Sequence, residues 1–208
     1  SKSFIFFEKV IKNMMGFKNI IPTHQGRAAE RILFFTIAKK GNYIPSNNHF
    51  DTTRANIMDA DAIPVDLVCN ESYDFKTHFK FKGNIDTDKL NDFINEKGVK
   101  NIPIIMLTIT NNTGGGQPVS MQNIKETSLI AKKYGIPFYL DACRFAENAY
   151  FIKKYEKKYK NVSIINIVKE IFSYADGCTM SAKKDAIANI GGFLCTNDDD
   201  LAQKIKNI

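Results

Sequence analysis

Apolar residues recur every three to four positions in several stretches of the chain, and these stretches alternate with short, nearly continuous apolar runs. The first pattern predicts amphipathic helices and the second predicts buried strands. Ser120 and Ser163 are predicted N-caps, and Gly98 and Gly135 are predicted helix stops. The predicted helices cover residues 24–39 (beginning near Gln25–Arg27), 89–97, 121–134, 145–159 and 164–175. The predicted strands cover residues 43–46, 62–69, 102–110, 136–140, 177–180 and 192–195.

Strands that alternate with helices of about 10–15 residues are typical of βαβ units and of a parallel sheet covered on both faces. We therefore predict a three-layer α/β fold, with helices on both faces of a mostly parallel sheet. No linker or internal repeat interrupts the pattern, so residues 1–208 are expected to form one domain. Ligands in such folds bind at the carboxyl ends of the strands. Here those ends are residues 110–112, 141–144 and 181–184.

Composition excludes several classes of protein. Of 208 residues, 44% are hydrophobic and 25% are charged, a balance typical of globular chains. No window approaches the ~18–20 apolar residues of a membrane span, and the N-terminus lacks the pattern of a signal peptide. Four dispersed cysteines without zinc spacing are expected to be reduced thiols, which favours the cytoplasm. The chain does not begin with Met, and we expect it to be processed or part of something longer.

The net charge of +7 would suit nucleic acid, anionic lipid or a phosphorylated ligand. Most of it comes from lysine, and the densest run, residues 153–160, falls at the end of a predicted helix. Lysines in that position are usually solvated. We therefore expect neither a nucleic-acid partner nor a membrane partner.

Three features at the predicted ligand-binding edge would suit a single cofactor. Asp141 is followed by Arg144, Ser181–Lys184 follows a strand, and Gln25–Arg27 begins a helix. A lysine can form a Schiff base, a carboxylate can keep a ring nitrogen protonated, and a helix N-terminus can bind phosphate. Together they predict pyridoxal 5′-phosphate. Taken singly, a strand-end Asp is often a helix cap and a loop lysine is usually solvated. Residues 114–116 lack a P-loop ending and predict a flexible turn.

Four longer motifs resemble the β-eliminating lyases, the family of tryptophanase and tyrosine phenol-lyase. They are residues 22–27, 115–120, 141–153 and 180–185. The motifs are long and correctly ordered, and the resemblance extends over essentially the whole chain. It implies the large, cofactor-binding domain of the fold type I pyridoxal-phosphate enzymes, with both ends of the family pattern incomplete.

The resemblance also implies roles for individual residues on the lysine and phosphate side. Lys184 matches the lysine that forms the Schiff base and serves as the catalytic base. Ser181 and Lys183 match phosphate-side groups. The phosphate cradle of the family matches Gln25, Gly26 and Arg27.

Around the cofactor ring, Asp141 matches the partner of the pyridinium nitrogen, and Phe50 matches the aromatic side chain that stacks on the ring. Arg144 and Asn112 match contacts to the ring oxygen. Asn189 falls where the family offers a backbone carbonyl to a monovalent cation, which would be K⁺.

Asp51 bears on the choice of substrate. Tryptophanases carry Asp after the stacking aromatic, whereas tyrosine phenol-lyases carry Thr, and a carboxylate could accept an indole N–H. Residues 145–147 also resemble tryptophanase, but 177–180 and 191–195 resemble the phenol-lyase. We favour cleavage of tryptophan to indole, pyruvate and ammonia, and keep cleavage of tyrosine to phenol as the alternative. Asp51 by itself could equally cap a turn.

Chains of this family are about twice as long and assemble as homotetramers built from dimers. We expect this chain to lack the small C-terminal domain, with its arginine for the substrate carboxylate, and to lack the N-terminal segment. Activity of the 208 residues alone is therefore doubtful. A threonine-aldolase-like lyase with the same cofactor, or a non-enzymatic remnant, stays open at this point.

Overall fold

A central sheet of five strands organises the chain. The computed structural model describes residues 2–207. In the sheet, the strands lie in the order β1 (Asn19–Thr23), β7 (Gly192–Thr196), β6 (Gly177–Ser181), β5 (Phe138–Asp141) and β4 (Ile105–Thr108). Neighbours β4, β5 and β6 are parallel, whereas β7 is antiparallel to both β6 and β1. The sheet is therefore mostly parallel, as predicted, with β7 running against the other four strands.

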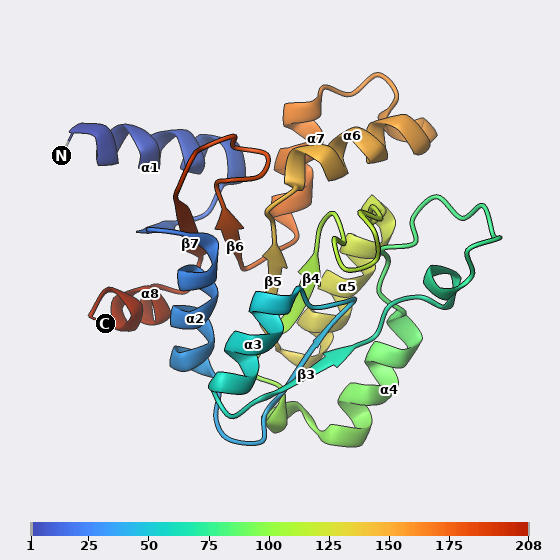
Figure 1. The fold of residues 1–208 in the computed structure, drawn as a ribbon, viewed down its shortest axis with the longest axis horizontal. Helices are drawn as coiled ribbons and strands as arrows, with labels where there is room; N and C mark the ends of the chain where they lie inside the picture. The colour runs from blue at the N-terminus through green and yellow to red at the C-terminus, as the bar shows by residue number, and fades with distance from the viewer. Residues whose placement is uncertain (1, 208) are drawn as a thin grey trace.

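In the part of the chain that the structure describes, eight α-helices and a separate two-stranded parallel sheet surround this core (Figure 1). The small sheet pairs β2 (Tyr43–Ser46) with β3 (Ile63–Asp66). The helices are α1 (Lys2–Met15), α2 (Gly26–Ile37), α3 (Asp51–Asp59), α4 (Thr87–Lys97), α5 (Met121–Tyr134), α6 (Phe145–Tyr155), α7 (Ile164–Ser173) and α8 (Asp199–Lys206).

Alternation along the strands divides the interior into two hydrophobic cores. Phe138 and Leu140 of β5 belong to one core, whereas Tyr139 between them belongs to the other. In β7 the same division separates Phe193 from Leu194. Successive strand residues point to opposite faces, so each core lies on one face of the sheet.

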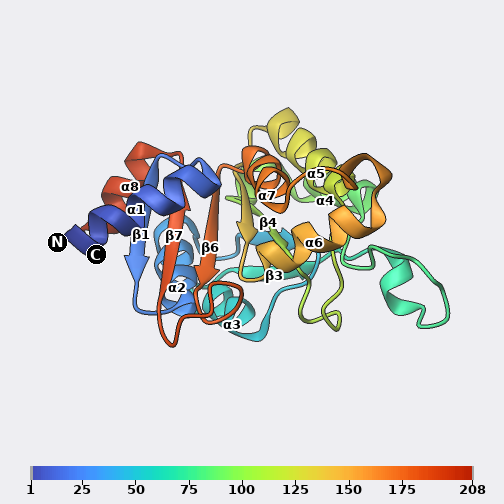
Figure 2. The same cartoon turned by 90° about the horizontal axis from the view of Figure 1, so that it is seen from above.

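The helices are distributed between these two cores, which gives the three predicted layers (Figures 1 and 2). Buried residues of α2, α3 and α8 pack in the core that contains Tyr139. Those of α1, α4, α5, α6 and α7 pack in the core that contains Phe138. Within residues 2–207, no helix has the length and apolar character that crossing a membrane requires.

The predicted elements all occur, with small shifts at their ends. Ser120 and Ser163 cap α5 and α7 as predicted, each accepting a hydrogen bond from a backbone N–H in the first turn. Helix α6 ends earlier than predicted, and a short 3₁₀ turn at Lys157–Tyr159 follows it. Four elements were not predicted: α1, β1, α3 and α8.

A buried amide joins the loop before α3 to the central sheet. Asn47 accepts a hydrogen bond from the Thr108 N–H at 2.9 Å and donates one to the Thr108 carbonyl at 3.0 Å. The side chain thus continues the hydrogen-bond pattern at the edge of β4. This fixes the segment that leads to Phe50 against the strand end where the candidate site lies.

Candidate active site

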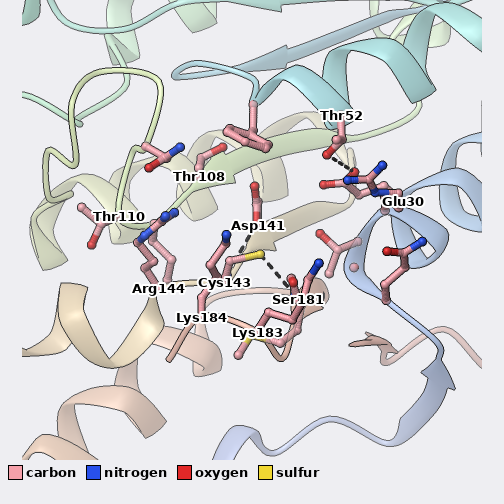
Figure 3. Close-up of a pocket in the computed structure, with 18 residues that line it drawn as sticks. Glu30, Thr52, Thr108, Thr110, Asp141, Cys143, Arg144, Ser181, Lys183 and Lys184 are labelled. Atoms are coloured by element: carbon pink, nitrogen blue, oxygen red, sulfur yellow. Dashed lines mark hydrogen bonds between the residues drawn. The ribbon is translucent and has the colours of Figure 1, made fainter. Parts of the chain in front are cut away.

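One pocket lies at the carboxyl ends of β4, β5 and β6, where the N-termini of α2 and α3 face them (Figure 3). This is the edge at which an open α/β sheet binds ligands. Its wall is formed by Gln25, Gly26, Arg27, Glu30, Phe50, Thr52, Thr108, Ile109, Thr110, Asn112, Asp141, Cys143, Arg144, Thr179, Met180, Ser181, Lys183 and Lys184.

All ten residues that the sequence assigns to the cofactor are in this wall, although they come from distant parts of the chain. They are Gln25, Gly26, Arg27, Phe50, Asn112, Asp141, Arg144, Ser181, Lys183 and Lys184. Two other candidates do not line it. Asp51 is the exposed first residue of α3, and Asn189 is exposed in the loop after Lys184.

The N-terminus of α2 forms one end of the pocket. Its N-cap, Gln25, has an extended backbone and makes no side-chain cap, so the side chain does not occupy the first N–H groups of the helix. A Cβ on Gly26 would lie 2.6 Å from the Cβ of Ser181, so only glycine allows this approach of helix to strand end. Free N–H groups, Arg27 and the hydroxyl of Ser181 together form an arrangement that suits a phosphate.

Asp141 lies at the end of β5 and is only 4% exposed. Burial raises the pKa of its carboxyl, and the N–H of Cys143 and the charge of Arg144 act in the opposite direction. The Cys143 N–H donates to Asp141 Oδ1 at 3.5 Å. A buried carboxyl with an unfilled bonding capacity is suited to a protonated ring nitrogen, because that partner would supply both a proton and a charge.

Phe50 is held by hydrogen bonds on either side of it in the chain. Before it, the backbone N–H and the ring Nδ1 of His49 lie 3.0 and 2.8 Å from Oδ1 of Asp66. After it, the hydroxyls of Thr52 and Thr53 donate to Glu30 at 3.0 and 2.7 Å. The position of the ring in the pocket wall is therefore fixed by its neighbours.

Glu30 also lines the pocket, although the sequence did not predict it as a site residue. Its carboxyl is buried and hydrogen-bonded to α3. Glu30 is 5% exposed, on the second turn of α2, and accepts hydrogen bonds from Thr52, Thr53 and Asn56 of α3. Burial first, and then the charge of Asp141, raise the pKa of the Glu30 carboxyl to about 7. In the sequence of this helix, Glu30 is a polar residue among apolar ones, and no motif or spacing predicts a role for it in the site.

Cys143, one of the four dispersed cysteines, forms part of the pocket wall. Its Sγ accepts a hydrogen bond from the Ser181 N–H at 3.2 Å and so ties β6 to the segment after β5. Burial raises the pKa of its thiol well above the ordinary value. A neutral thiol of this kind is a packing and hydrogen-bonding group and not a nucleophile.

Two threonines give an independent sign that the pocket is built for a polar ligand. Thr110 Oγ1 and Thr179 Oγ1 are buried in its wall and have no hydrogen-bond partner within residues 2–207. Buried hydroxyls are normally paired, so these two suggest a bound group. A phosphorylated pyridine aldehyde matches the donors at α2, the acid Asp141 and the amine of Lys184, so the residues present fit pyridoxal phosphate.

Comparison with known proteins agrees with this geometry. The sequence pattern of the family described as "Beta-eliminating lyase" matches residues 1–207. The chain belongs to the β-eliminating lyase family. Among curated relatives, it is 53% identical over 207 residues to a tryptophanase of Salinibacter ruber, covering 100% of this chain and 44% of that relative. It is 49% identical over 204 residues to a tyrosine phenol-lyase of Pasteurella multocida, covering 98% of this chain and 44% of that one.

The fold class of this member of the family is confirmed by its likeness to a solved structure. A crystal structure of NtdA from Bacillus subtilis, with bound cofactor PMP, superimposes with a TM-score of 0.63 at 20% identity. The superimposed region covers 97% of this chain and 38% of the NtdA chain. The family and the predicted fold are thus confirmed, and the chain spans less than half the length of the curated relatives it matches.

Proposed function

We propose that this chain is the cofactor-binding part of a pyridoxal-phosphate-dependent lyase that eliminates the aromatic group of an amino acid. The observation that supports this most directly is the meeting of ten separately predicted residues in one pocket at the strand ends. The favoured reaction converts tryptophan and water to indole, pyruvate and ammonia. The curated relatives include a tryptophanase and a tyrosine phenol-lyase, and this part of the proposal rests on the β-eliminating lyase family to which the chain belongs.

The residues divide the work as follows. Gln25, the N–H groups of α2, Arg27 and Ser181 bind the phosphate, and Lys183 adds positive charge nearby. Phe50 packs on the ring face. When bound, pyridoxal phosphate supplies a protonated ring that can take up the electron pair left when the α-proton is removed.

The remaining residues either contact the nitrogen and oxygen of the ring or transfer a proton. Asp141 holds the proton of the ring nitrogen, and Arg144 and Asn112 bind the ring oxygen. The Nζ of Lys184 would hold the cofactor, and when it is free of the cofactor it would be placed to take the α-proton of the substrate as general base. The aromatic ring leaves with a proton on carbon, and hydrolysis of the three-carbon remainder gives pyruvate and ammonia.

Tyrosine is the second candidate substrate, because relatives of both kinds match with similar identity. Asp51 directly follows Phe50 and is exposed beside the pocket, where we propose that it accepts the indole N–H. Release of phenol from tyrosine in preference to indole from tryptophan would overturn this choice. Release of glycine and an aldehyde would instead indicate a threonine-aldolase-like reaction.

We further propose that the complete protein is a cytoplasmic homo-oligomer, a dimer or tetramer, that binds a monovalent cation through the Asn189 carbonyl. These statements follow from the family resemblance. Gel filtration with light scattering, and cofactor titration in K⁺ against Na⁺, would test them.

Covalent attachment of the cofactor is the decisive experiment. The chain is mixed with pyridoxal phosphate, its visible absorbance is recorded, and borohydride reduction is followed by peptide mapping. We expect a reduced pyridoxyl adduct on Lys184, its loss in Lys184→Ala and its retention, with weaker cofactor binding, in the matched variant Lys183→Ala. An adduct that survives in Lys184→Ala, or no adduct on a folded chain, would contradict the proposal.

A further inference from the structure

The loop between β6 and β7 presents Lys184 to the pocket, but the lysine itself is held only through its backbone. Both Lys183 and Lys184 are exposed, and neither side chain has a hydrogen-bond or ion-pair partner within residues 2–207. The loop closes on itself where the Ala188 N–H donates to the Ala182 carbonyl at 2.9 Å. A contact between this loop and the rest of the fold is therefore needed to fix where Lys184 lies.

Asp185, the next residue, makes that outside contact. Its Oδ2 accepts hydrogen bonds from the backbone N–H groups of Ala146 at 2.7 Å and Glu147 at 3.0 Å. Its own N–H donates to the Cys143 carbonyl at 3.3 Å. Three hydrogen bonds thus join one residue of the lysine loop to the segment between β5 and α6.

The start of α6 needs this partner. Arg144 is its N-cap, and the Arg144 side chain makes no cap hydrogen bond. The first N–H groups of a helix have no partner within the helix, and a carboxylate there also meets the positive end of the helix dipole. Asp185 therefore caps a helix that lies about 40 residues earlier in the chain.

The cap that Asp185 provides for α6 also fixes the relative positions of residues in the pocket. Helix α6 directly follows the strand end that carries Asp141 and Arg144, so a clamp on its first turn fixes the Lys184 loop relative to both. We propose that Asp185 is a positioning residue, which holds the Lys184 loop at the correct place relative to Asp141 and Arg144. This inference rests on the proposed role of Lys184.

The test compares Asp185→Ala with Asp185→Asn in the 208-residue chain. The amide oxygen of Asn can still accept both N–H groups, whereas Ala removes the cap. Because displacement of a reacting group by about 1 Å can cost ~100-fold in rate, we expect Asp185→Ala to slow covalent attachment at Lys184 by about 10- to 100-fold. Attachment in Asp185→Asn should be within about threefold of the rate in the original chain. If Asp185 acted only through its negative charge, Asn would slow attachment as much as Ala does.

A second readout needs no cofactor. Hydrogen exchange of the peptide covering residues 182–190 should lose protection in Asp185→Ala and keep it in Asp185→Asn. The matched control is Asp198→Ala, which removes the carboxylate that caps α8 by accepting the Leu201 N–H at 2.9 Å. It removes a helix cap away from the pocket and should change neither the attachment rate nor the exchange of the loop.

The outcomes separate this inference from the proposed function. Unchanged attachment and unchanged exchange in Asp185→Ala would overturn the positioning role while leaving Lys184 in place. No attachment in the original chain would overturn the proposed function, and the exchange measurement would still decide whether Asp185 holds the loop. Should Asp185→Ala fail to fold, Asp185→Leu replaces it, because Leu has a similar shape and no hydrogen-bond acceptor, and an attachment rate equal to that of the original chain would count against the clamp.

Discussion

At the scale of residues, two buried carboxyls in one pocket must differ in charge if the pocket is to work. Asp141 has the charge of Arg144 acting on it, whereas Glu30 is surrounded by hydroxyl and amide groups of α3. Like charges in a shared low-dielectric site oppose each other's ionisation. We infer that Glu30 holds a proton near neutral pH more readily than an ordinary carboxyl. Burial raises the pKa of Asp141 as well, so we infer that a positively charged ring nitrogen beside it would be what favours its ionised form.

The raised pKa of Glu30 leads to a prediction about stability. Its value of about 7 in the fold, against an ordinary 4.5, means that the folded chain binds the proton more tightly than the unfolded chain. The stabilisation is present below pH 4.5 and is lost as the pH rises to about 7. At ~1.4 kcal/mol for each pH unit, the loss is of the order of 3 kcal/mol.

Urea unfolding of the original chain and of Glu30→Gln at pH 5 and pH 8 would measure this. Gln cannot ionise, so the free energy of unfolding of the original chain should fall relative to that of Glu30→Gln as the pH is raised. Titrating groups that do not interact with Glu30 affect both chains alike and cancel in the difference, so the difference reports on Glu30 together with its neighbour Asp141. A difference that stays constant between the two pH values would show that Glu30 has an ordinary pKa.

At the scale of elements, the approach of α2 to β6 gives a prediction about cofactor binding. A Cβ on Gly26 would lie 2.9 Å from the Cα of Ser181 as well as 2.6 Å from its Cβ, so the backbone itself must move. Overpacking of this kind costs about 1–3 kcal/mol. We expect Gly26→Ala to weaken pyridoxal-phosphate binding by about tenfold or more, measured by absorbance titration.

Gly135→Ala is the matched control for that measurement. Gly135 ends α5 with a φ of +66° and has no atom within 4 Å of an added Cβ. The substitution strains a left-handed residue away from the pocket, so it should lower stability and leave cofactor affinity unchanged. Equal affinities for Gly26→Ala and the original chain would show that the helix start does not bind the phosphate.

Periodicity explains which elements could be predicted. Helices such as α5 have an apolar stripe, a capping Ser and a terminal Gly, so local sequence and packing agree. Helix α3 has almost no stripe, and its place depends on the contacts of Thr52 and Thr53 with Glu30. Strand β1 contains Pro22, which argues against a central strand but is allowed at the sheet edge where it lies.

The residues of the candidate site likewise fall into those that the sequence could predict and those that it could not. Three of the four family motifs contain eight of the ten candidate cofactor residues, because each motif is long and local, whereas Phe50 and Asn112 were matched to the family outside these motifs. Glu30 and Asp185 act through contacts with distant segments, at Thr53 and Ala146 respectively. No pattern in a single sequence encodes such pairings, so their roles became visible only in the fold.

At the scale of the whole molecule, the two hydrophobic cores share the strands of one sheet. Tyr139 faces one core and its neighbours Phe138 and Leu140 face the other, so neither core can lose its packing without disturbing β5. This argues that residues on both faces unfold together in one cooperative transition. The two hydrophobic cores therefore share one sheet, and the carboxyl ends of the strands of that sheet support the pocket.

The corresponding prediction uses one buried residue from each face. Leu33 of α2 and Ile167 of α7 are fully buried on opposite sides of the sheet. Leu33→Ala and Ile167→Ala should each lower the free energy of unfolding by about 2–5 kcal/mol. Urea unfolding should remain a single transition in both, with coincident curves from far-ultraviolet circular dichroism and tyrosine fluorescence. If either variant unfolded in two steps, the two faces would be separate cooperative units, and the pocket would rest on only one of them.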